Sequence, residues 1–172
     1  MNYTIIDDYL PKEIAQEIED YLIGPNAQFP WFYNQNVVAP GDGKMNLHNH
    51  QFTHVFYKNW QPHSTYFSII EPIVMKINPK CLERIKANLN PVTDEKIVYD
   101  WHVDIRGINP YAKTAIYYVN TNNGVTMFED GTEIESIANR LVVFDQNIRH
   151  TGTTCTDQKV RCLLNLNYID NV

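Results

Sequence analysis

Beyond residue 81 the chain alternates polar and apolar residues with a period of two, which is the pattern of β-strands rather than helices. The strand-like runs cover residues 82–89, 113–120, 125–128, 132–137, 141–144 and 159–168. Turn sequences separate some of these runs, among them Asn122-Asn123-Gly124 and Glu129-Asp130-Gly131. Many short strands without intervening helices favour a sandwich or barrel over a parallel sheet with crossover helices. We therefore expect a double-stranded β-helix, or jelly roll, over residues 81–170.

Helical patterns are confined to the first part of the chain. An apolar stripe at four-residue spacing predicts a first helix, and its members are Leu10, Ile14, Ile18 and Leu22. Gly24-Pro25 ends this helix, and a second is predicted over residues 66–77, where Pro72 marks a kink or a fresh start. Residues 25–63 combine Pro, Gly and Asn with scattered aromatics, which indicates loops and short irregular strands. The predicted fold class is thus mainly β with N-terminal helices.

The chain has 172 residues, of which 44% are hydrophobic and 20% are charged, so it can form one globular domain with a core of its own. Within a single domain of residues 1–172, we expect residues 1–80 to provide helical and loop support. Residues 81–170 would form the core. The aromatic-rich stretch 29–60 could form a lid over a binding site.

Charge and cysteine content argue against several classes of protein. The formal net charge of -6 is unlike that of nucleic-acid-binding proteins, which usually present a basic face. No window approaches the ~20 apolar residues of a membrane span, and the N-terminus lacks the pattern of a signal peptide. Three cysteines without a CxxC pair favour a reduced, cytoplasmic protein.

Two histidines and an aspartate form a candidate metal site. His102-Val103-Asp104 places two potential ligands two positions apart on a predicted strand, where both would point to one face. His150 follows a buried-looking strand later in the chain. Two imidazoles and one carboxylate can fill one face of an octahedron and leave the other to exchangeable ligands, as in non-heme Fe(II) oxygenases. A short His-x-Asp by itself is more often a surface pair or a hydrogen-bonded core pair.

Arg161 opens the last apolar strand, eleven positions after His150. A buried arginine needs an anionic partner, and its planar guanidinium matches a carboxylate with two parallel hydrogen bonds. The alternative is an edge-strand arginine whose charged end reaches solvent. Together with the metal ligands, Arg161 favours a site that binds a carboxylic acid beside a metal.

Other polar residues favour simpler interpretations. His48, His50 and His54 suggest a second metal site, but Pro40, Gly41 and Gly43 precede them, so a solvated loop is preferred. Arg84 and Lys86 alternate with Ile85 and Ala87, and they could line a site and attract an anionic substrate. A strand face exposed to solvent is the preferred interpretation.

Residues 82–168 resemble the 2-oxoglutarate/Fe(II) dioxygenase superfamily, most closely its prolyl-4-hydroxylase-like branch, which includes small phage- and marine-microbe-encoded members. The metal ligands and the arginine occur in the family's order and spacing. Three further segments are similar to family strands: Thr114-Ala115-Ile116-Tyr117-Tyr118-Val119-Asn120, Gly124-Val125-Thr126-Met127-Phe128 and Arg140-Leu141-Val142-Val143-Phe144. A phage-encoded member would act in the host cytoplasm.

The resemblance implies an enzyme that uses Fe(II), 2-oxoglutarate and O₂ to hydroxylate a C–H bond, with release of succinate and CO₂. It implies that His102, Asp104 and His150 bind the iron. Arg161 would pair with the C5 carboxylate of 2-oxoglutarate, and Tyr118 would donate its hydroxyl to the same group. Strand alternation places Ile116 on the face of Tyr118 and turns Tyr117 away.

The sequence departs from the family pattern at two positions. Asn90-Pro91 stands where close relatives often have tyrosine before proline, so a contact of Asn90 with the co-substrate is open. Leu163 stands where many relatives have serine or threonine. Asp104 is present, and because the halogenating branch replaces this carboxylate with a small residue, hydroxylation is favoured.

The substrate is open at this point. A prolyl residue in a peptide or protein is the first candidate from the resemblance, and a free amino acid or small metabolite is the alternative. Base demethylation in nucleic acid is disfavoured by the acidic charge balance. Two other classes are kept: a cupin-like jelly roll that binds metal as an isomerase or sugar-binding module, and a structural protein. The oligomeric state is unknown.

Overall fold

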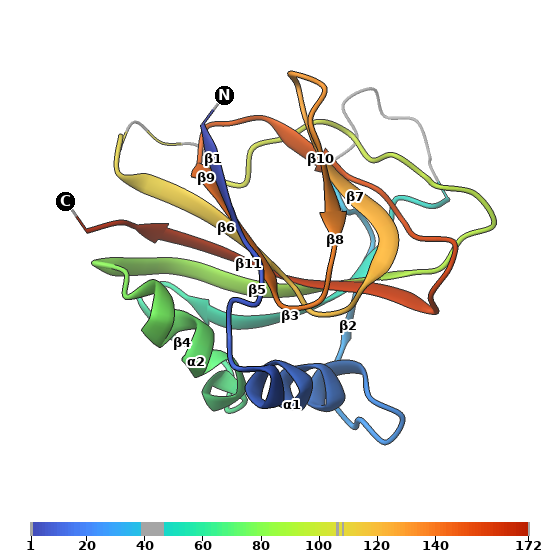
Figure 1. Cartoon of the computed structure of the whole chain (residues 1–172), viewed down its shortest axis with the longest axis horizontal. Coiled ribbons are helices and arrows are strands. Elements are labelled where there is room, and N and C mark those ends of the chain that lie inside the picture. The colour runs from blue at the N-terminus through green and yellow to red at the C-terminus, as the bar shows by residue number, and fades with distance from the viewer. Residues whose placement is uncertain (1, 39–46, 106, 108, 172) are drawn as a thin grey trace.

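Two antiparallel sheets pack face to face in this computed structural model, which describes residues 2–38, 47–105, 107 and 109–171 (Figure 1). The elements in chain order are β1 (Tyr3–Ile6), α1 (Lys12–Ile23), β2 (Phe32–Asn34), β3 (Gln51–Lys58), β4 (Gln61–Pro62), α2 (Phe67–Ile77), β5 (Cys81–Pro91), β6 (Ala112–Tyr118), β7 (Asn122–Phe128), β8 (Glu133–Ser136), β9 (Arg140–Asp145), β10 (His150–Gly152) and β11 (Val160–Ile169). The fold is mainly β, and each strand predicted beyond residue 81 is confirmed.

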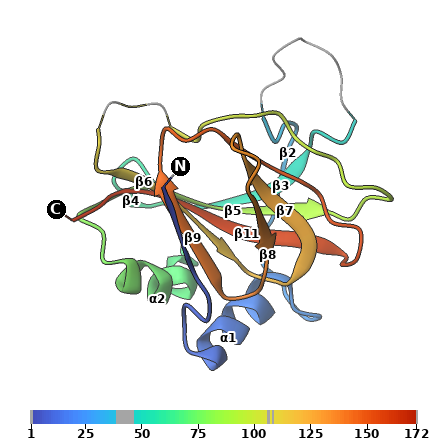
Figure 2. The ribbon, with the colours of Figure 1, turned by 45° about the horizontal axis from the view of Figure 1, so that its top comes forward.

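The large sheet has the strand order β1-β9-β6-β11-β5-β3-β2, with β4 paired to the edge of β3. The small sheet has the order β10-β7-β8 and lies over one face of the large one (Figure 2). Neighbours in the large sheet are far apart in sequence: β11 pairs with both β5 and β6. Such non-local antiparallel pairing is typical of a β-sandwich.

The two helices cover the other face of the large sheet (Figure 1). The apolar stripe of α1 packs there through Ile18 and Leu22, and α2 packs through Ile70 and Ile73. The side chains of the sheet that meet the helices are Ile85, Ala87, Ala115, Tyr117, Leu141, Cys162, Leu164 and Leu166. Each fully buried aliphatic side chain stabilises the fold by roughly 1.5–3 kcal/mol. This helix-side core therefore carries most of the apolar burial.

The opposite face of the large sheet meets the small sheet. A smaller apolar cluster fills part of that interface, with Ile116, Tyr118, Phe128, Phe144 and Leu163 among its members. Alternation along β6 thus separates Tyr117 from Tyr118, as predicted. The remaining space between the sheets is lined by polar side chains.

Several expectations for the first half of the chain are corrected. The first element is a strand, β1, which pairs with β9, and helix α1 starts only at Lys12. The segment predicted as loops and short irregular strands contains β3, an eight-residue strand that pairs with β5. The first half therefore contributes strands to the sheet itself and does more than support it. Residues 39–46, part of the segment suggested as a lid, lie outside the described residues.

Local predictions were met in part. Pro72 lies inside a single helix, α2, which ends at Asn78 in the left-handed conformation with φ 51°. Asn122-Asn123-Gly124 lies within β7, where the register with β8 shifts, and does not form a turn between strands. Gly131 has φ +87° and sits in the turn predicted after β7.

The three cysteines are free, and no helix in the described ranges is long and apolar enough to cross a bilayer.

Candidate functional site

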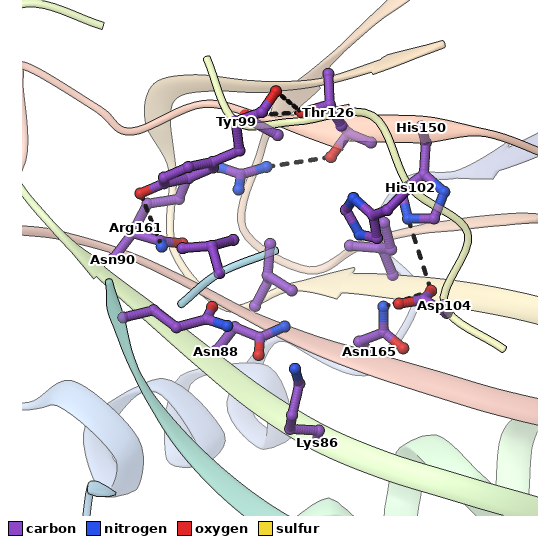
Figure 3. Close-up of a pocket in the computed structure, with 16 residues that line it drawn as sticks. Lys86, Asn88, Asn90, Tyr99, His102, Asp104, Thr126, His150, Arg161 and Asn165 are labelled. Atoms are coloured by element: carbon purple, nitrogen blue, oxygen red, sulfur yellow. Dashed lines mark hydrogen bonds and ion pairs between the residues drawn. The ribbon is translucent and has the colours of Figure 1, made fainter. Parts of the chain in front are cut away.

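A cavity opens between the two sheets, with an empty volume of about 520 Å³, part of which is open to solvent. Side chains from β5, β7, β10, β11 and the 99–104 segment converge on it (Figure 3). Its walls combine hydroxyl and apolar groups with amide, basic and acidic ones. Five of the six residues singled out from the sequence line it, namely Asn90, His102, Asp104, His150 and Arg161, and the ring of the sixth, Tyr118, lies beneath the Arg161 guanidinium.

The two histidines of the predicted metal site face each other across an antiparallel bridge. The backbone N–H of each donates to the carbonyl of the other at 3.0 Å, and their ring centroids are 4.7 Å apart. His150 begins β10, whereas His102 lies in a segment outside the regular strands that pairs through isolated bridges, Val98 with Thr153 and His102 with His150. The prediction that His102 and Asp104 share a regular strand is therefore wrong, because the chain bends after this bridge.

Asp104 completes the cluster. The ligand atoms of His102, Asp104 and His150 all lie within 4.8 Å of one another, and His150 Nε2 is 3.6 Å from Asp104 Oδ2. Asn165 Nδ2 donates to Asp104 Oδ2 at 2.8 Å, and Arg84 donates to Oδ1 at 3.2 Å. Burial raises the pKa of Asp104, but the nearby His150, Arg84 and Asn165 outweigh this and hold it below its usual value. The carboxylate is therefore ionised and ready to bind a cation.

Backbone carbonyls orient both imidazole rings. Nδ1 of His102 lies 3.1 Å from the carbonyl of Asp100, and Nδ1 of His150 lies 3.1 Å from that of Ile148. Because a carbonyl only accepts, each Nδ1 carries the proton and each Nε2 keeps its lone pair for a metal. Burial, followed by the neighbouring His150, lowers the pKa of His102, which keeps that ring neutral.

Two imidazole nitrogens and one carboxylate therefore converge on one point that borders an open cavity. Within the described ranges, no second group of three such ligands forms. This donor set suits Fe(II) in an oxygenase and leaves coordination positions on the cavity side. The residues present fit that metal.

Arg161 is buried at the other end of the cavity, with a relative exposure of 2%. Its Nε donates to Ser136 Oγ at 2.9 Å, and its Nη2 donates to Thr126 Oγ1 at 3.1 Å. No carboxylate among the described residues pairs with it, and burial lowers its pKa. A buried cation without an anionic partner is costly, so the site fits a ligand that brings a carboxylate.

Tyr118 and Gly124 hold this arginine in place. The guanidinium lies over the Tyr118 ring at 5.8 Å from its centroid, and the Tyr118 hydroxyl donates to Thr126 Oγ1 at 2.8 Å. A side chain at position 124 would place its Cβ only 2.5 Å from Arg161 Cδ. The family-like Gly-x-Thr segment therefore supplies both a hydrogen-bond acceptor for Arg161 and the space that it occupies.

Asn90 lies opposite Arg161 in the register between β5 and β11. Its Nδ2 donates to the hydroxyl of Tyr99 at 3.1 Å, and both side chains line the cavity. Burial raises the pKa of Tyr99 to about 12, so its hydroxyl stays protonated. Sequence reasoning missed Tyr99 because it belongs to no regular strand. Its position three residues before His102 was the only signal.

The polar face of β5 was expected to face solvent, and instead it faces the cavity. Lys86 and Asn88 line the cavity, as does Asn165 on the adjacent strand β11 (Figure 3). Burial lowers the pKa of Lys86 to about 8. Arg84 bonds to Asp104 and to Asn167 Oδ1, at 3.2 and 3.0 Å. The second sheet covers this face, and a single strand's alternation cannot reveal that.

The other histidines have no part in this site. His54 is buried on β3 with Nδ1 2.8 Å from the carbonyl of Pro30 and Nε2 2.7 Å from Ser64 Oγ. Its ring packs against Phe29 and Phe56. The preferred solvated loop is therefore wrong for His54, which is a structural core histidine.

No protein-family model and no curated protein sequence matches the chain. Solved structures do. A Trichoplax adhaerens prolyl hydroxylase in complex with a peptide fragment of the hypoxia inducible factor oxygen degradation domain superposes with a TM-score of 0.69 at 14% identity, over 98% of this chain and 83% of that one. A Pseudomonas putida prolyl-4-hydroxylase gives 0.60 at 15% identity, over 98% and 92%.

A 2OG-Fe(II) oxygenase family oxidoreductase from Burkholderia pseudomallei superposes with a TM-score of 0.60 at 10% identity, over 96% of this chain and 84% of that one. At such identities the likeness establishes the fold, and it confirms the resemblance first seen in the sequence at that level. The chain has the fold shared by the prolyl hydroxylases and other 2OG-Fe(II) oxygenases.

Proposed function

We propose that this chain is a 2-oxoglutarate- and Fe(II)-dependent dioxygenase that hydroxylates a C–H bond. One observation carries the proposal: a buried arginine without a carboxylate partner in the described residues shares a cavity with two imidazoles and a carboxylate that converge on one point. The unpaired arginine is unfavourable without a bound anion, and the cluster of two imidazoles and a carboxylate is unfavourable without a bound cation. Together they match a metal ion and a dicarboxylic acid.

His102, Asp104 and His150 would hold the iron, with both rings presenting Nε2. The carbonyls of Asp100 and Ile148 fix the rings in that orientation. Asn165 and Arg84 hold the carboxylate through hydrogen bonds and keep it ionised. When bound, Fe(II) with 2-oxoglutarate and O₂ supplies the oxidant for hydroxylation, and succinate and CO₂ are released. Because Asp104 fills the third protein position, hydroxylation is favoured over halogenation.

Arg161 would hold the distal carboxylate of 2-oxoglutarate through its Nη atoms, since Nη1 makes no hydrogen bond with the described residues. The Tyr118 hydroxyl can turn from Thr126 to the same carboxylate. Asn90 and Tyr99 form a hydrogen-bonded pair at this end and can contact the co-substrate. Ile116 and Leu163 line the cavity with apolar surface and keep water from this part of it.

Anaerobic addition of Fe(II) and 2-oxoglutarate tests the proposal without a known substrate. We expect a weak visible charge-transfer band and, on admission of O₂, slow uncoupled formation of succinate. The Asp104→Ala variant should give neither. A wild-type protein that binds Fe(II) but shows no band and forms no succinate would refute the proposal and leave the cupin-like alternative. A cupin site usually gathers more histidines and has no need of Arg161.

The first substrate candidate is a prolyl residue in a peptide or protein. The solved Trichoplax prolyl hydroxylase, which has the same fold, holds a peptide. Mass spectrometry of proline-containing peptides incubated with the enzyme would reveal the gain of one oxygen atom. Three free cysteines support the proposal of a reducing, cytoplasmic environment. A single domain over residues 1–172 is supported by the large sheet, which joins strands from both halves of the chain.

A further inference from the structure

One cation in the cavity has no role in the function proposed above. Lys86 is on the cavity face of β5, and its side chain points into the space between the sheets (Figure 3). It forms no hydrogen bond or ion pair with any residue in the described part of the chain. Lys86 is half-buried, and an ammonium group partly withdrawn from water without a partner is unfavourable, so we expect a ligand to pair with it.

Asn88 lies two positions along the same strand and therefore points to the same side. Its amide also forms no hydrogen bond with the described residues, and its Oδ1 is buried from solvent. Figure 3 shows the ends of Lys86 and Asn88 directed into the same part of the cavity. An ammonium and an amide N–H side by side offer two hydrogen bonds to one acceptor group.

Asp104 does not need Lys86 as a partner. Its Oδ1 already accepts from Arg84 at 3.2 Å and its Oδ2 from Asn165 at 2.8 Å. Nor does Lys86 lie beside the arginine. In the register between β5 and β11, Lys86 lies opposite Asn165, and Arg161 lies opposite Asn90. Asn90 is four positions from Lys86 on β5, a separation of about 13 Å along the strand.

The charges of the loaded site leave this lysine unbalanced. Here the argument rests on the proposed function. A divalent iron, Arg161 and Arg84, which is paired with Asp104, bring four positive charges, and Asp104 with doubly ionised 2-oxoglutarate brings three negative ones. Lys86 adds a further positive charge, so the loaded site carries an excess of two. A substrate that carries a negative charge would reduce this excess.

We propose that Lys86, assisted by Asn88, binds the carboxylate of the substrate, and that the substrate is a small free carboxylic acid such as an amino acid. Two parallel hydrogen bonds from these side chains match the two oxygens of a carboxylate. A prolyl residue inside a peptide carries an amide at this place and would leave the ammonium unpaired. The polar groups of this cavity therefore favour the free acid over the peptidyl proline that the similarity to prolyl hydroxylases suggests.

Binding can be measured without turnover on protein loaded with Zn(II), which has no redox chemistry, and 2-oxoglutarate. The probes are the free L-amino acids and the straight-chain acids of three to six carbons, each compared with its own primary amide. We expect at least one acid to bind, and its amide to bind roughly ten- to a hundredfold more weakly. Isothermal titration calorimetry gives both affinities.

The Lys86→Met variant should bind the acid no better than the amide, with the affinity for the amide unchanged. Lys86→Arg keeps the positive charge and should keep the preference for the acid. The unchanged affinity of Lys86→Met for the amide excludes a folding defect in that variant. Lys58→Met removes the same charge from an exposed position on β3 and should change neither affinity.

Any of three results would overturn the assignment: that no acid in the panel binds, that acid and amide bind equally, or that a proline-containing peptide binds with an affinity that Lys86→Met leaves unchanged. A loss of 2-oxoglutarate affinity in Lys86→Met as large as the loss for the acid would assign the lysine to the co-substrate. Wild-type protein that fails to bind 2-oxoglutarate would refute the proposed function itself. Intact 2-oxoglutarate binding with any of the other results would refute only the role of Lys86.

Discussion

Arg161→Met separates the binding of the dicarboxylic acid from the stability of the fold. Methionine fills a similar volume with no charge and few hydrogen-bonding demands. The guanidinium it replaces is buried and bonds to two hydroxyl groups, Ser136 Oγ and Thr126 Oγ1. Thr126 keeps the hydrogen bond from Tyr118 in the variant, so only the Ser136 hydroxyl loses its partner.

The magnitude follows from the contacts that Arg161 would make with a carboxylate. Two charge-assisted hydrogen bonds are worth about 1.5–3 kcal/mol each, and truncating one side of a buried charge pair costs about 2–5 kcal/mol. The dissociation constant of 2-oxoglutarate should therefore rise by roughly two to three orders of magnitude. Without ligand, the free energy of unfolding of the variant should differ from that of the wild type by less than about 2 kcal/mol, because the arginine that it lacks was buried without an anion.

Thermal unfolding of Zn(II)-loaded protein at increasing 2-oxoglutarate concentration measures both quantities. At a hundred times the dissociation constant, the ligand should stabilise the wild type by about 2.7 kcal/mol. In a domain of this size that raises Tm by about 5–11 °C. Arg161→Met should shift by no more than about 2 °C at that concentration, whereas Arg140→Met, which removes an ion pair with Asp7 outside the cavity, should keep the full shift. A shift in Arg161→Met as large as that of the wild type would refute the reasoning.

Three further changes test other parts of the structure. Asp104→Ala removes one of three metal ligands and should weaken Fe(II) binding by more than roughly a hundredfold in a metal titration; binding within tenfold of the wild type would contradict the ligand assignment. Gly124→Ala places a methyl group 2.5 Å from Arg161 Cδ and should weaken 2-oxoglutarate binding by roughly tenfold, whereas Gly131→Ala, with no atom within 4 Å of the new Cβ, should not. Burial lowers the pKa of His54, so the unfolded chain binds more protons than the folded one below about pH 6.5, and the free energy of unfolding should fall as the pH drops through that range. Urea unfolding at pH 7.5 and 5.5 should show a smaller difference for His54→Phe than for the wild type, and an equal difference would exclude this histidine as a cause.

The strands of the second half could be predicted because apolar and polar residues alternate there and turn residues separate some of the runs. β3 could not, and its local chemistry gives the reason. The register with β5 shifts between Val55 and Tyr57, so the phase of the alternation changes within the strand. Buried Gln51 and His54 add polar residues to positions that a simple pattern leaves for apolar ones. Bulges and buried hydrogen-bonded polar groups hide a strand from periodicity.

The candidate metal ligands and Arg161 could be found from the sequence because their residue types and order are unusual. The residues around them could not. Tyr99 lies outside the regular strands, so no period places it. The hydrogen bonds that Arg161 donates to Thr126 and Ser136 form because the small sheet lies over the large one, so they depend on tertiary packing that no local pattern shows.

The position of Lys86 shows why a polar strand face is ambiguous. A strand with Ile85 and Ala87 on one face and Arg84 and Lys86 on the other has the same pattern whether the polar face meets solvent or a cavity. What distinguishes the two cases is the rest of the fold: the helices already cover the apolar face, and the small sheet covers the other. Because the helix-side core supplies most of the apolar burial, the cavity side can hold charged groups that destabilise the empty protein. Those groups are explained by what they bind, and a half-buried lysine beside a metal site is therefore stronger evidence for an anionic ligand than the same lysine on an exposed surface.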